Sequence, residues 1–191
     1  MYVTSPFAAD SQSDMLALVA AHPLGALVRT GAGGLEADHI PFELVPASSD
    51  APYGVLRAHV ARANPVWRSE GRPVLVLFQG ASSYVSPLLY DLEAAGGRAV
   101  PTWNYAVVHA HGRLRAIEDP AWILGQMSRL TRHLEDARAG WKVKDAPRDY
   151  IDRIVRATVG IEIVIERLEG KFKMSQNRTP DERARVLAAM R

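Results

Sequence analysis

Four side chains with different chemistry stand together in the stretch Val100-Pro101-Thr102-Trp103-Asn104-Tyr105. A hydroxyl, an indole, a carboxamide and a phenol make a poor core, but together they suit a flat molecule with polar edges. Patterns typical of strands flank this stretch, so we expect it at the mouth of a strand, where it can offer donors to a ligand. The alternative is a turn begun by Pro101, with the two aromatic rings packed locally.

A second stretch of interest lies near the C-terminus, at Lys171-Phe172-Lys173-Met174-Ser175-Gln176-Asn177-Arg178. In an extended chain, Lys171, Lys173 and Ser175 lie on one face, and Phe172, Met174 and Gln176 lie on the other. This pattern predicts a row of donors suited to a phosphate, backed by an apolar row. Solvated surface charge is the alternative for these cations.

The segment His109-Ala110-His111 places two imidazoles on one face of a predicted strand, a spacing that can bind a metal ion. The chain has six histidines and no cysteine, and no third ligand follows at a spacing typical of metal sites. We therefore expect no metal site, and we interpret both histidines as polar side chains that contact a ligand or solvent.

Several common catalytic signatures are missing. Ser82, Ser83 and Ser86 lie close together, but no G-x-S-x-G elbow surrounds them. Gly31-Ala32-Gly33-Gly34 precedes a strand pattern and not a helix, which indicates a hairpin turn and not a dinucleotide-binding loop. Without cysteine, the chain has no disulfide framework, thiolate metal site or cysteine nucleophile.

The composition is that of an ordinary globular protein. The chain has 191 residues, of which 48% are hydrophobic and 23% charged, enough for one full core. Lysine and arginine number 23 against 21 acidic residues, a surplus too small to imply nucleic-acid binding by itself. No apolar run is long enough to span a membrane, and the first residues do not resemble a signal peptide. We expect a cytoplasmic protein.

The first half of the chain indicates a helix followed mainly by strands. Residues 13–21 have helical spacing, and residues 24–30 and 35–45 read as a hairpin, followed by a strand at 53–60. Residues 74–78 are apolar on both faces, which predicts a strand covered on both sides. Gln79-Gly80 predicts a turn, followed by a short strand at 81–86.

The second half contains two long strands and three helices. Residues 105–117 alternate, with a bulge expected at Gly112, and helices are expected after Pro120 and Pro147. Residues 159–166 form the clearest half-buried strand, and the Thr179–Glu182 capping box predicts a last helix at about 180–190. We therefore predict one α+β, mainly β, domain over residues 1–191: a barrel of six to seven strands with peripheral helices.

Several motifs together resemble the PaiB family of FMN-binding negative transcriptional regulators. The resemblance covers nearly the whole chain in order, and it rests on Met1-Tyr2 with Phe7 and Asp10, His22 to Gly25, Ala37 to Phe42, His59 to Trp67, Phe78-Gln79-Gly80, Tyr84 to Pro87, Val100 to Tyr105, and Lys173 to Arg178. It implies the FMN-binding split-barrel fold, a homodimer, and flavin held in clefts at the dimer interface. One departure is Leu88-Leu89, where an aromatic residue is expected, so the resemblance does not say what covers the flavin on that side.

The requirements of FMN assign roles to the candidate residues. FMN needs cationic or hydroxyl groups for its phosphate, hydrogen-bonding groups along the pyrimidine edge, and an apolar wall for its ring. The candidates are Lys173, Ser175, Arg178, His59, Arg62 and Ser86 for the phosphate, Gln176, Asn104 and Thr102 for the edge, and Trp103 with Tyr84 for the ring. For each of them, packing or surface solvation is the alternative.

Two functions remain open from the sequence. The resemblance implies a flavin-binding repressor of transcription with DNA as a partner, although the helices expected after Pro120 and Pro147 are too far apart in sequence for a helix-turn-helix. The same fold also resembles FMN-dependent oxidoreductases, namely flavin reductases and pyridoxamine phosphate oxidases. For that function, His109 or Tyr105 is the candidate proton donor.

Overall fold

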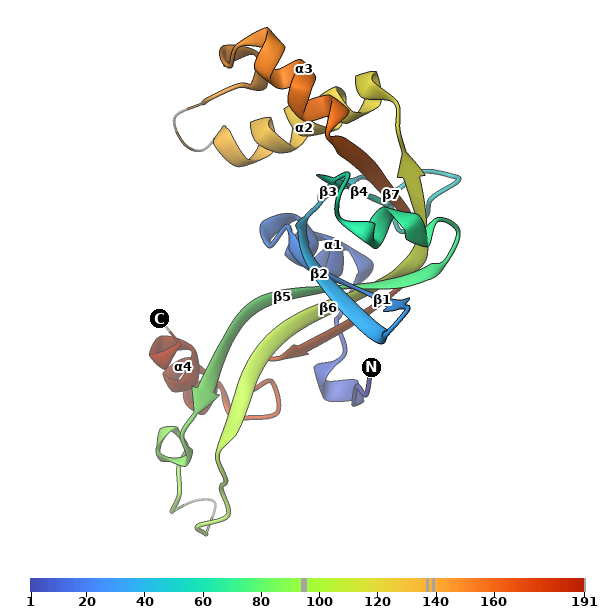
Figure 1. Ribbon diagram of the computed structural model, residues 1–191. Coiled ribbons are helices and arrows are strands. Elements are labelled where there is room, and N and C mark those ends of the chain that lie inside the picture. Colours follow the sequence, from blue (N-terminus) through green and yellow to red (C-terminus); the bar gives the residue numbers. More distant parts are fainter. Residues whose placement is uncertain (94–95, 137, 139, 191) are drawn as a thin grey trace.

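A curled antiparallel sheet forms the frame of the protein (Figure 1). The computed structural model describes residues 1–93, 96–136, 138 and 140–190. In these residues the strands are β1 (Leu24–Gly31), β2 (Gly34–Pro41), β3 (Glu43–Val45), β4 (Val55–Ala61), β5 (Pro73–Val85), β6 (Thr102–Ile117) and β7 (Thr158–Lys173). The helices are α1 (Gln12–Ala21), α2 (Pro120–Glu135), α3 (Arg148–Arg156) and α4 (Pro180–Ala189), with short 3₁₀ turns η1 (Ser5–Phe7), η2 (Pro65–Ser69), η3 (Pro87–Leu89) and η4 (Val143–Asp145).

The longer helices begin where capping side chains satisfy the first free amide groups. The Ser11 hydroxyl accepts a hydrogen bond from the Asp14 amide at 3.1 Å, and the Asp119 carboxylate accepts one from the Ala121 amide at 3.0 Å. At α4, the Thr179 hydroxyl and the Glu182 carboxylate each accept from the other residue's amide, at 3.3 and 3.2 Å. No helix in the described residues is both long and apolar enough to cross a membrane.

The strands follow the order β2-β1-β5-β6-β7-β4-β3, with every neighbouring pair antiparallel. Strand β6 lies in the middle and pairs with β5 on one side and β7 on the other. The predicted turn at Gln79-Gly80 is wrong, because β5 continues through it with a bulge between Gln79 and Ser82. At Gly80, a side chain would meet Leu18 Cδ1 of α1 at 3.3 Å, so glycine lets the helix approach the bulged strand.

The main core lies on the concave side of the sheet. It contains the alternate side chains that face inward from β1, β4, β5, β6 and β7, among them Leu27, Leu56, Val76, Phe78, Val108, Ala110, Ile161 and Ile163. Phe42, between β2 and β3, packs edge-on against Phe78 with ring centroids 5.8 Å apart. Across the gap between η2 and β2, the Asn64 amide donates to the Asp38 carboxylate at 2.8 Å.

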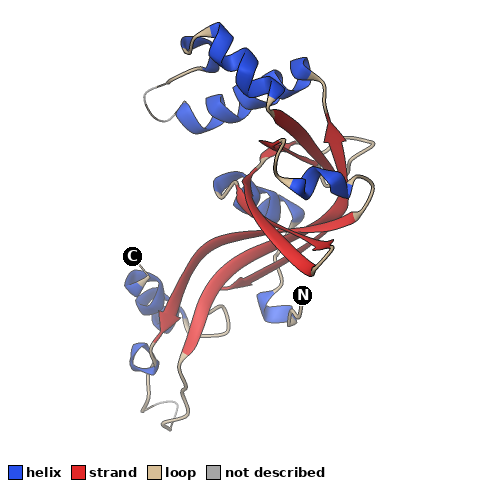
Figure 2. Ribbon diagram, viewed as in Figure 1, coloured by secondary structure: helices blue, strands red, loops and turns tan. Residues whose placement is uncertain are grey.

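Two smaller clusters lie at opposite ends of the molecule (Figures 1 and 2). At one end, α2 and α3 pack around Ile123, Met127 and Val155. At the other end, β5 and β6 extend beyond the curled part of the sheet as a segment that we call the arm (residues 80–85 and 102–106). Strand β7 pairs with the arm only at Tyr105 and Ala106. Helix α4 covers one side of the arm, where Val186 packs with Val85 and Tyr90.

Gly112 lies at the position where a bulge is expected in β6. The pairing of β6 with β7 does shift by one residue between His111 and Gly112, but the unpaired residue is Glu166, so the bulge lies on β7 opposite this point. A Cβ atom at Gly112 would lie 2.3 Å from the carbonyl oxygen of Val164 and 2.7 Å from Ile163 Cγ2. The close approach of β7 at this point therefore requires a residue without a side chain.

We predict that Gly112→Ala lowers the free energy of unfolding by about 1–3 kcal/mol, because the added methyl group forces the backbone of β7 to move. The measurement is urea unfolding followed by circular dichroism. Gly33→Ala is the matched control, since a Cβ atom there has no neighbour within 4 Å. Equal stability of the two variants would show that the bulge does not depend on glycine.

Candidate functional site

One face of strands β5, β6 and β7 points away from the core and holds most of the side chains that could bind a ligand. Because ladder partners lie on the same face, the registers place fourteen side chains together, and we call this surface the open face: Leu75, Leu77, Gln79, Ser82 and Tyr84 of β5, Trp103, Tyr105, Val107, His109 and His111 of β6, and Arg167, Glu169, Lys171 and Lys173 of β7. None of the fourteen is fully buried.

An aromatic pair marks the arm end of the open face. Tyr84 and Trp103 are ladder partners, and their rings meet edge to face with centroids 6.1 Å apart. The two residues are 52% and 56% exposed, which is high for aromatic side chains in contact with each other. Exposed rings at a strand end offer a flat ligand an apolar wall. Residues 102–105 of the predicted ligand-binding stretch belong to β6 itself, where pairing with β5 fixes the direction of their side chains.

Two lysines of β7 lie beside these rings. The Lys173 ammonium donates to the hydroxyl of Thr102 and to the carbonyl oxygen of Trp103, the latter at 2.9 Å. Lys171 Nζ lies 5.5 Å from the ring centroid of Tyr105 and 5.6 Å from that of Tyr2. No carboxylate in the described residues pairs with Lys173, so its charge is available to an anionic ligand.

Three predicted site residues use their polar groups inside the protein. Asn104 and Ser175 are only 1% and 4% exposed. The Asn104 amide donates to the Ser175 hydroxyl at 3.1 Å, and that hydroxyl lies 3.2 Å from Asn104 Oδ1. The Gln176 carbonyl accepts from the Met174 amide at 2.6 Å, and its NH₂ group donates to the Phe172 carbonyl. These bonds hold the loop that follows β7 against β6, and a direct role in binding stays a prediction.

Arg178 and Ser86 lie on the α4 side of the arm. The Arg178 guanidinium stacks over Tyr90 at 4.0 Å from the ring centroid, and Tyr90 packs with Val186 of α4. The Ser86 hydroxyl caps η3 by accepting from the Leu88 amide at 3.3 Å. Nearby, a hydrogen bond from the Asp91 amide lowers the pKa of Glu182, so this carboxylate stays charged where it joins α4 to the arm.

His59 and Arg62 lie at the opposite end of the sheet. His59 Nδ1 is 2.7 Å from Gln126 Oε1 of α2, and the Arg62 guanidinium binds Glu118 at 2.5 Å. His59 is the ladder partner of Gly160, thirteen residues before Lys173 on β7. At roughly 3.3 Å per residue this is about 40 Å along the strand. One chain therefore does not bring His59 and Arg62 to the arm.

His109 and His111 meet a carboxylate that the sequence analysis missed. Glu169 is the ladder partner of His109, and its Oε2 lies 2.9 Å from His111 Nε2. Burial lowers the pKa of His109, which keeps this imidazole neutral near pH 7. Burial raises the pKa of Glu169, but the hydrogen bond with His111 and nearby positive charges outweigh it, so the net shift is downward. Only the register of β7 on β6 reveals this third group.

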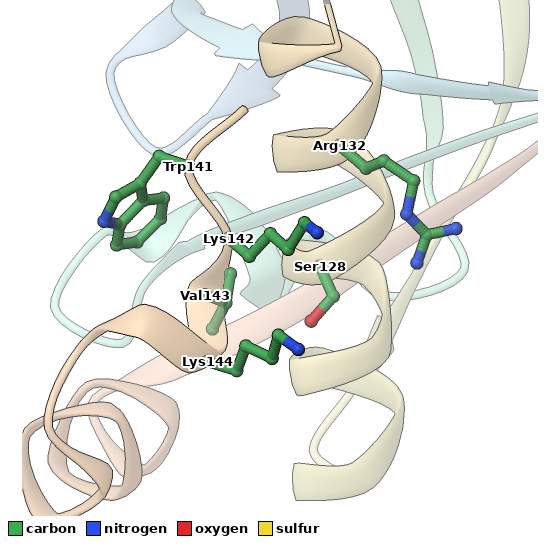
Figure 3. A pocket seen from close by; sticks show the side chains of 6 residues that line it. All are labelled: Ser128, Arg132, Trp141, Lys142, Val143 and Lys144. Carbon is green, nitrogen blue, oxygen red and sulfur yellow. The ribbon is translucent and has the colours of Figure 1, made fainter. Parts of the chain in front are cut away.

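A cationic pocket of about 370 Å³ lies between α2 and η4, far from the arm (Figure 3). Its lining residues are Ser128, Arg132, Trp141, Lys142, Val143 and Lys144. The two lysines extend toward the helix that carries Ser128 (Figure 3). Both lysines are exposed and line this cavity, and the Asp145 carboxylate of η4 lies beside them, where it accepts a hydrogen bond from the Lys142 amide at 2.8 Å.

Comparisons with known proteins identify the same fold and family. Residues 1–167 match the family described as "Putative FMN-binding domain". An uncharacterized protein of Emericella nidulans is 34% identical over 98% of this chain and 89% of its own length. Protease synthase and sporulation protein PAI 2 of Bacillus subtilis is 28% identical over 98% of this chain and 87% of its own.

A solved structure shares the architecture. The FAD and heme binding protein of Mycobacterium smegmatis superposes with a TM-score of 0.66 at 19% identity, over 95% of this chain and 79% of that one. At this identity the likeness concerns the fold, and it agrees with the expected split barrel. Together with the family match, it confirms the mainly β, flavin-binding class of fold predicted from the sequence.

Proposed function

The chain belongs to this FMN-binding domain family, as the resemblance to PaiB predicts, and from this premise we propose that it acts as a homodimer that holds FMN between the arm of one copy and the surface of the other. FMN is the cofactor, and the fold is the split barrel. The observation that carries the proposal is the exposed Tyr84–Trp103 pair beside Lys173, which pairs with no carboxylate of the described residues.

The residues at the arm end of the open face fit FMN. A dianionic phosphate is bound most strongly by a cation together with a hydroxyl donor, which Lys173 and Thr102 supply as a contacting pair. A flavin ring requires an apolar wall, which Trp103 and Tyr84 supply. When bound, FMN supplies electron-transfer chemistry, while the protein's part is to orient it and to exclude water.

A second copy of the chain supplies what one arm lacks. Val74, Val76 and Phe78 of β5 are buried in the core, whereas Leu75 and Leu77 on the open face are only partly buried. The sequence predicts a strand covered on both sides, and the described chain covers only one of them. We call Leu75 and Leu77 the apolar patch. A two-fold dimer places this patch of both copies at the interface. It also provides the only route by which His59 and Arg62 could reach a flavin seated on the arm.

We further propose that the FMN-bound dimer regulates transcription. The cationic pocket lined by Arg132, Lys142 and Lys144 is suited to a phosphate group of a nucleic-acid backbone. In the described residues, α2 and α3 are joined by a long connection and not by the short turn of a helix-turn-helix. The pocket would therefore act through backbone contacts. A cytoplasmic location, which the sequence predicts, is consistent with this role.

The second candidate function is FMN-dependent oxidoreduction. It is favoured by a single observation, namely that His109, held neutral by burial, shares the open face with Tyr105 and Trp103. A neutral imidazole can accept or deliver a proton near a bound flavin.

We predict that Lys173→Ala removes most of the protein's preference for FMN over riboflavin, which has the same ring and no phosphate. A hydrogen bond to a charged group contributes about 1.5–3 kcal/mol, so FMN affinity should fall roughly 10- to 100-fold while riboflavin affinity stays nearly unchanged. Fluorescence titration of both flavins measures these affinities.

The controls for this titration separate the ring seat from the phosphate seat. Trp103→Ala should weaken both flavins alike, because it removes a wall for the ring, and Lys144→Ala at the far pocket should change neither. Full retention of the FMN preference in Lys173→Ala would show that the phosphate is held elsewhere, for instance by Arg62 or Arg178.

We predict that Leu77→Glu converts the dimer to a monomer, because a carboxylate at the centre of the apolar patch would be desolvated without a partner. Light scattering at micromolar concentration measures the mass, and circular dichroism checks that the variant is folded. Leu35→Glu is the matched control, since Leu35 is exposed at the β1–β2 turn. A wild-type monomer, or a dimeric Leu77→Glu variant, would contradict the proposed interface.

A gel shift and a nicotinamide oxidation assay together separate the two candidate functions. As a regulator, the protein with FMN should retard duplex DNA from upstream of its own coding region at a stated salt concentration, and replacing Arg132, Lys142 and Lys144 by Ala should abolish the shift. It should not oxidise reduced nicotinamide faster than free FMN does. Rapid oxidation without a gel shift would assign the protein to the oxidoreductases.

A further inference from the structure

His109, His111 and Glu169 bring three potential metal ligands together on the middle of the open face. One ligand atom from each of the three side chains lies within 4.8 Å of the others. The two histidines are two residues apart on β6, and Glu169 faces His109 from β7. All three side chains are half-buried, and they project from central strands and not from a mobile loop. A cluster on paired strands is well positioned to bind an ion without a large rearrangement.

The surroundings of the cluster orient these groups. Arg167 Nη1 lies 2.6 Å from Glu169 Oε1, and Glu169 Oε2 lies 2.9 Å from His111 Nε2 and 3.3 Å from the amino group of Met1. Opposite the step from His111 to Gly112, β7 carries a bulge whose unpaired residue is Glu166. Leu75 and Leu77, the ladder partners of His111 and His109 on β5, shield the other side. Such outer partners normally hold metal ligands in place.

We propose that His109, His111 and Glu169 bind one divalent first-row transition-metal ion of the zinc class. Two imidazoles and one carboxylate are donors that suit Zn²⁺ and its neighbours, whereas hard cations such as Mg²⁺ prefer oxygen ligands. Three protein ligands leave at least one coordination position open, as in catalytic and not in structural zinc sites. Binding replaces the His111–Glu169 hydrogen bond with bonds from both groups to the ion.

The metal site lies beside the proposed flavin seat but does not share its residues. Glu169 and Lys173 are four residues apart on β7, or about 13 Å along the strand. The ion would therefore occupy the middle of the open face and leave Lys173, Thr102 and Trp103 free. The proposal rests on the geometry within one chain, so it does not depend on the proposed dimer or on regulation.

The test is a titration of the full-length, metal-free protein, without any affinity tag, with Co²⁺. Co²⁺ replaces Zn²⁺ in sites of this type and gives a visible absorption band when bound by protein ligands. We expect saturation at one Co²⁺ per chain and loss of the band when Zn²⁺ is added. His109→Ala and His111→Ala should each weaken Co²⁺ binding by at least about tenfold. Tenfold is the smallest typical loss when a residue that only supports a metal ligand is removed, and these variants remove a ligand itself.

Two further variants keep the test decisive. Glu169→Gln preserves size and polarity, and it should keep the thermal stability of the metal-free protein while losing affinity for Co²⁺. Saturating Zn²⁺ should raise the melting temperature of the wild type, since it binds the folded state, and should leave that of Glu169→Gln unchanged. His39→Ala, at an exposed histidine on β2, should bind like the wild type. A missing Co²⁺ band, wild-type affinity in the three ligand variants, or an equal loss in His39→Ala would each overturn the proposal.

Discussion

The pairing of β6 with both β5 and β7 is the interaction on which the rest of the structure depends. Strand β5 pairs along residues 102–113 and β7 along residues 105–117, so together they cover all sixteen residues of β6 and give every side chain of that strand a fixed face. Val108 and Ala110 face the core, whereas Trp103, Tyr105, His109 and His111 face outward. The same ladder sets Lys173 and Glu169 beside them. The proposed flavin seat and the proposed metal site are therefore two parts of one surface created by strand pairing.

Local patterns predicted the elements well, because caps, alternation and bulges are encoded within a few residues. The capping box at Thr179 and the alternation along β6 are examples. The turn expected at Gln79-Gly80 failed because glycine also marks a bulge in a continuous strand, and only pairing with β6 decides between the two. Glu169 was missed for a related reason. Its position opposite His109 depends on a register between strands far apart in sequence.

Residue chemistry alone could not separate binding groups from structural ones. Asn104, Ser175 and Gln176 have side chains suited to a pyrimidine edge or a phosphate, yet the fold pairs them internally, as buried polar groups require. Lys173 and Trp103 also have side chains suited to a flavin, and theirs remain accessible to a ligand. The hydrogen bonds of the loop after β7 hold it against β6, while the residues at the strand ends form the surface where we propose that the flavin binds.

Our central claim is that FMN occupies the open face of a dimer. The most direct test is size-exclusion chromatography of the full-length protein after incubation with excess FMN. Light scattering gives the mass of the eluted species, and visible absorbance gives its flavin content. The account predicts a peak with the mass of two chains that carries flavin absorbance equal to one FMN per chain. A peak without flavin absorbance, or a peak with the mass of one chain and a full complement of FMN, would contradict it.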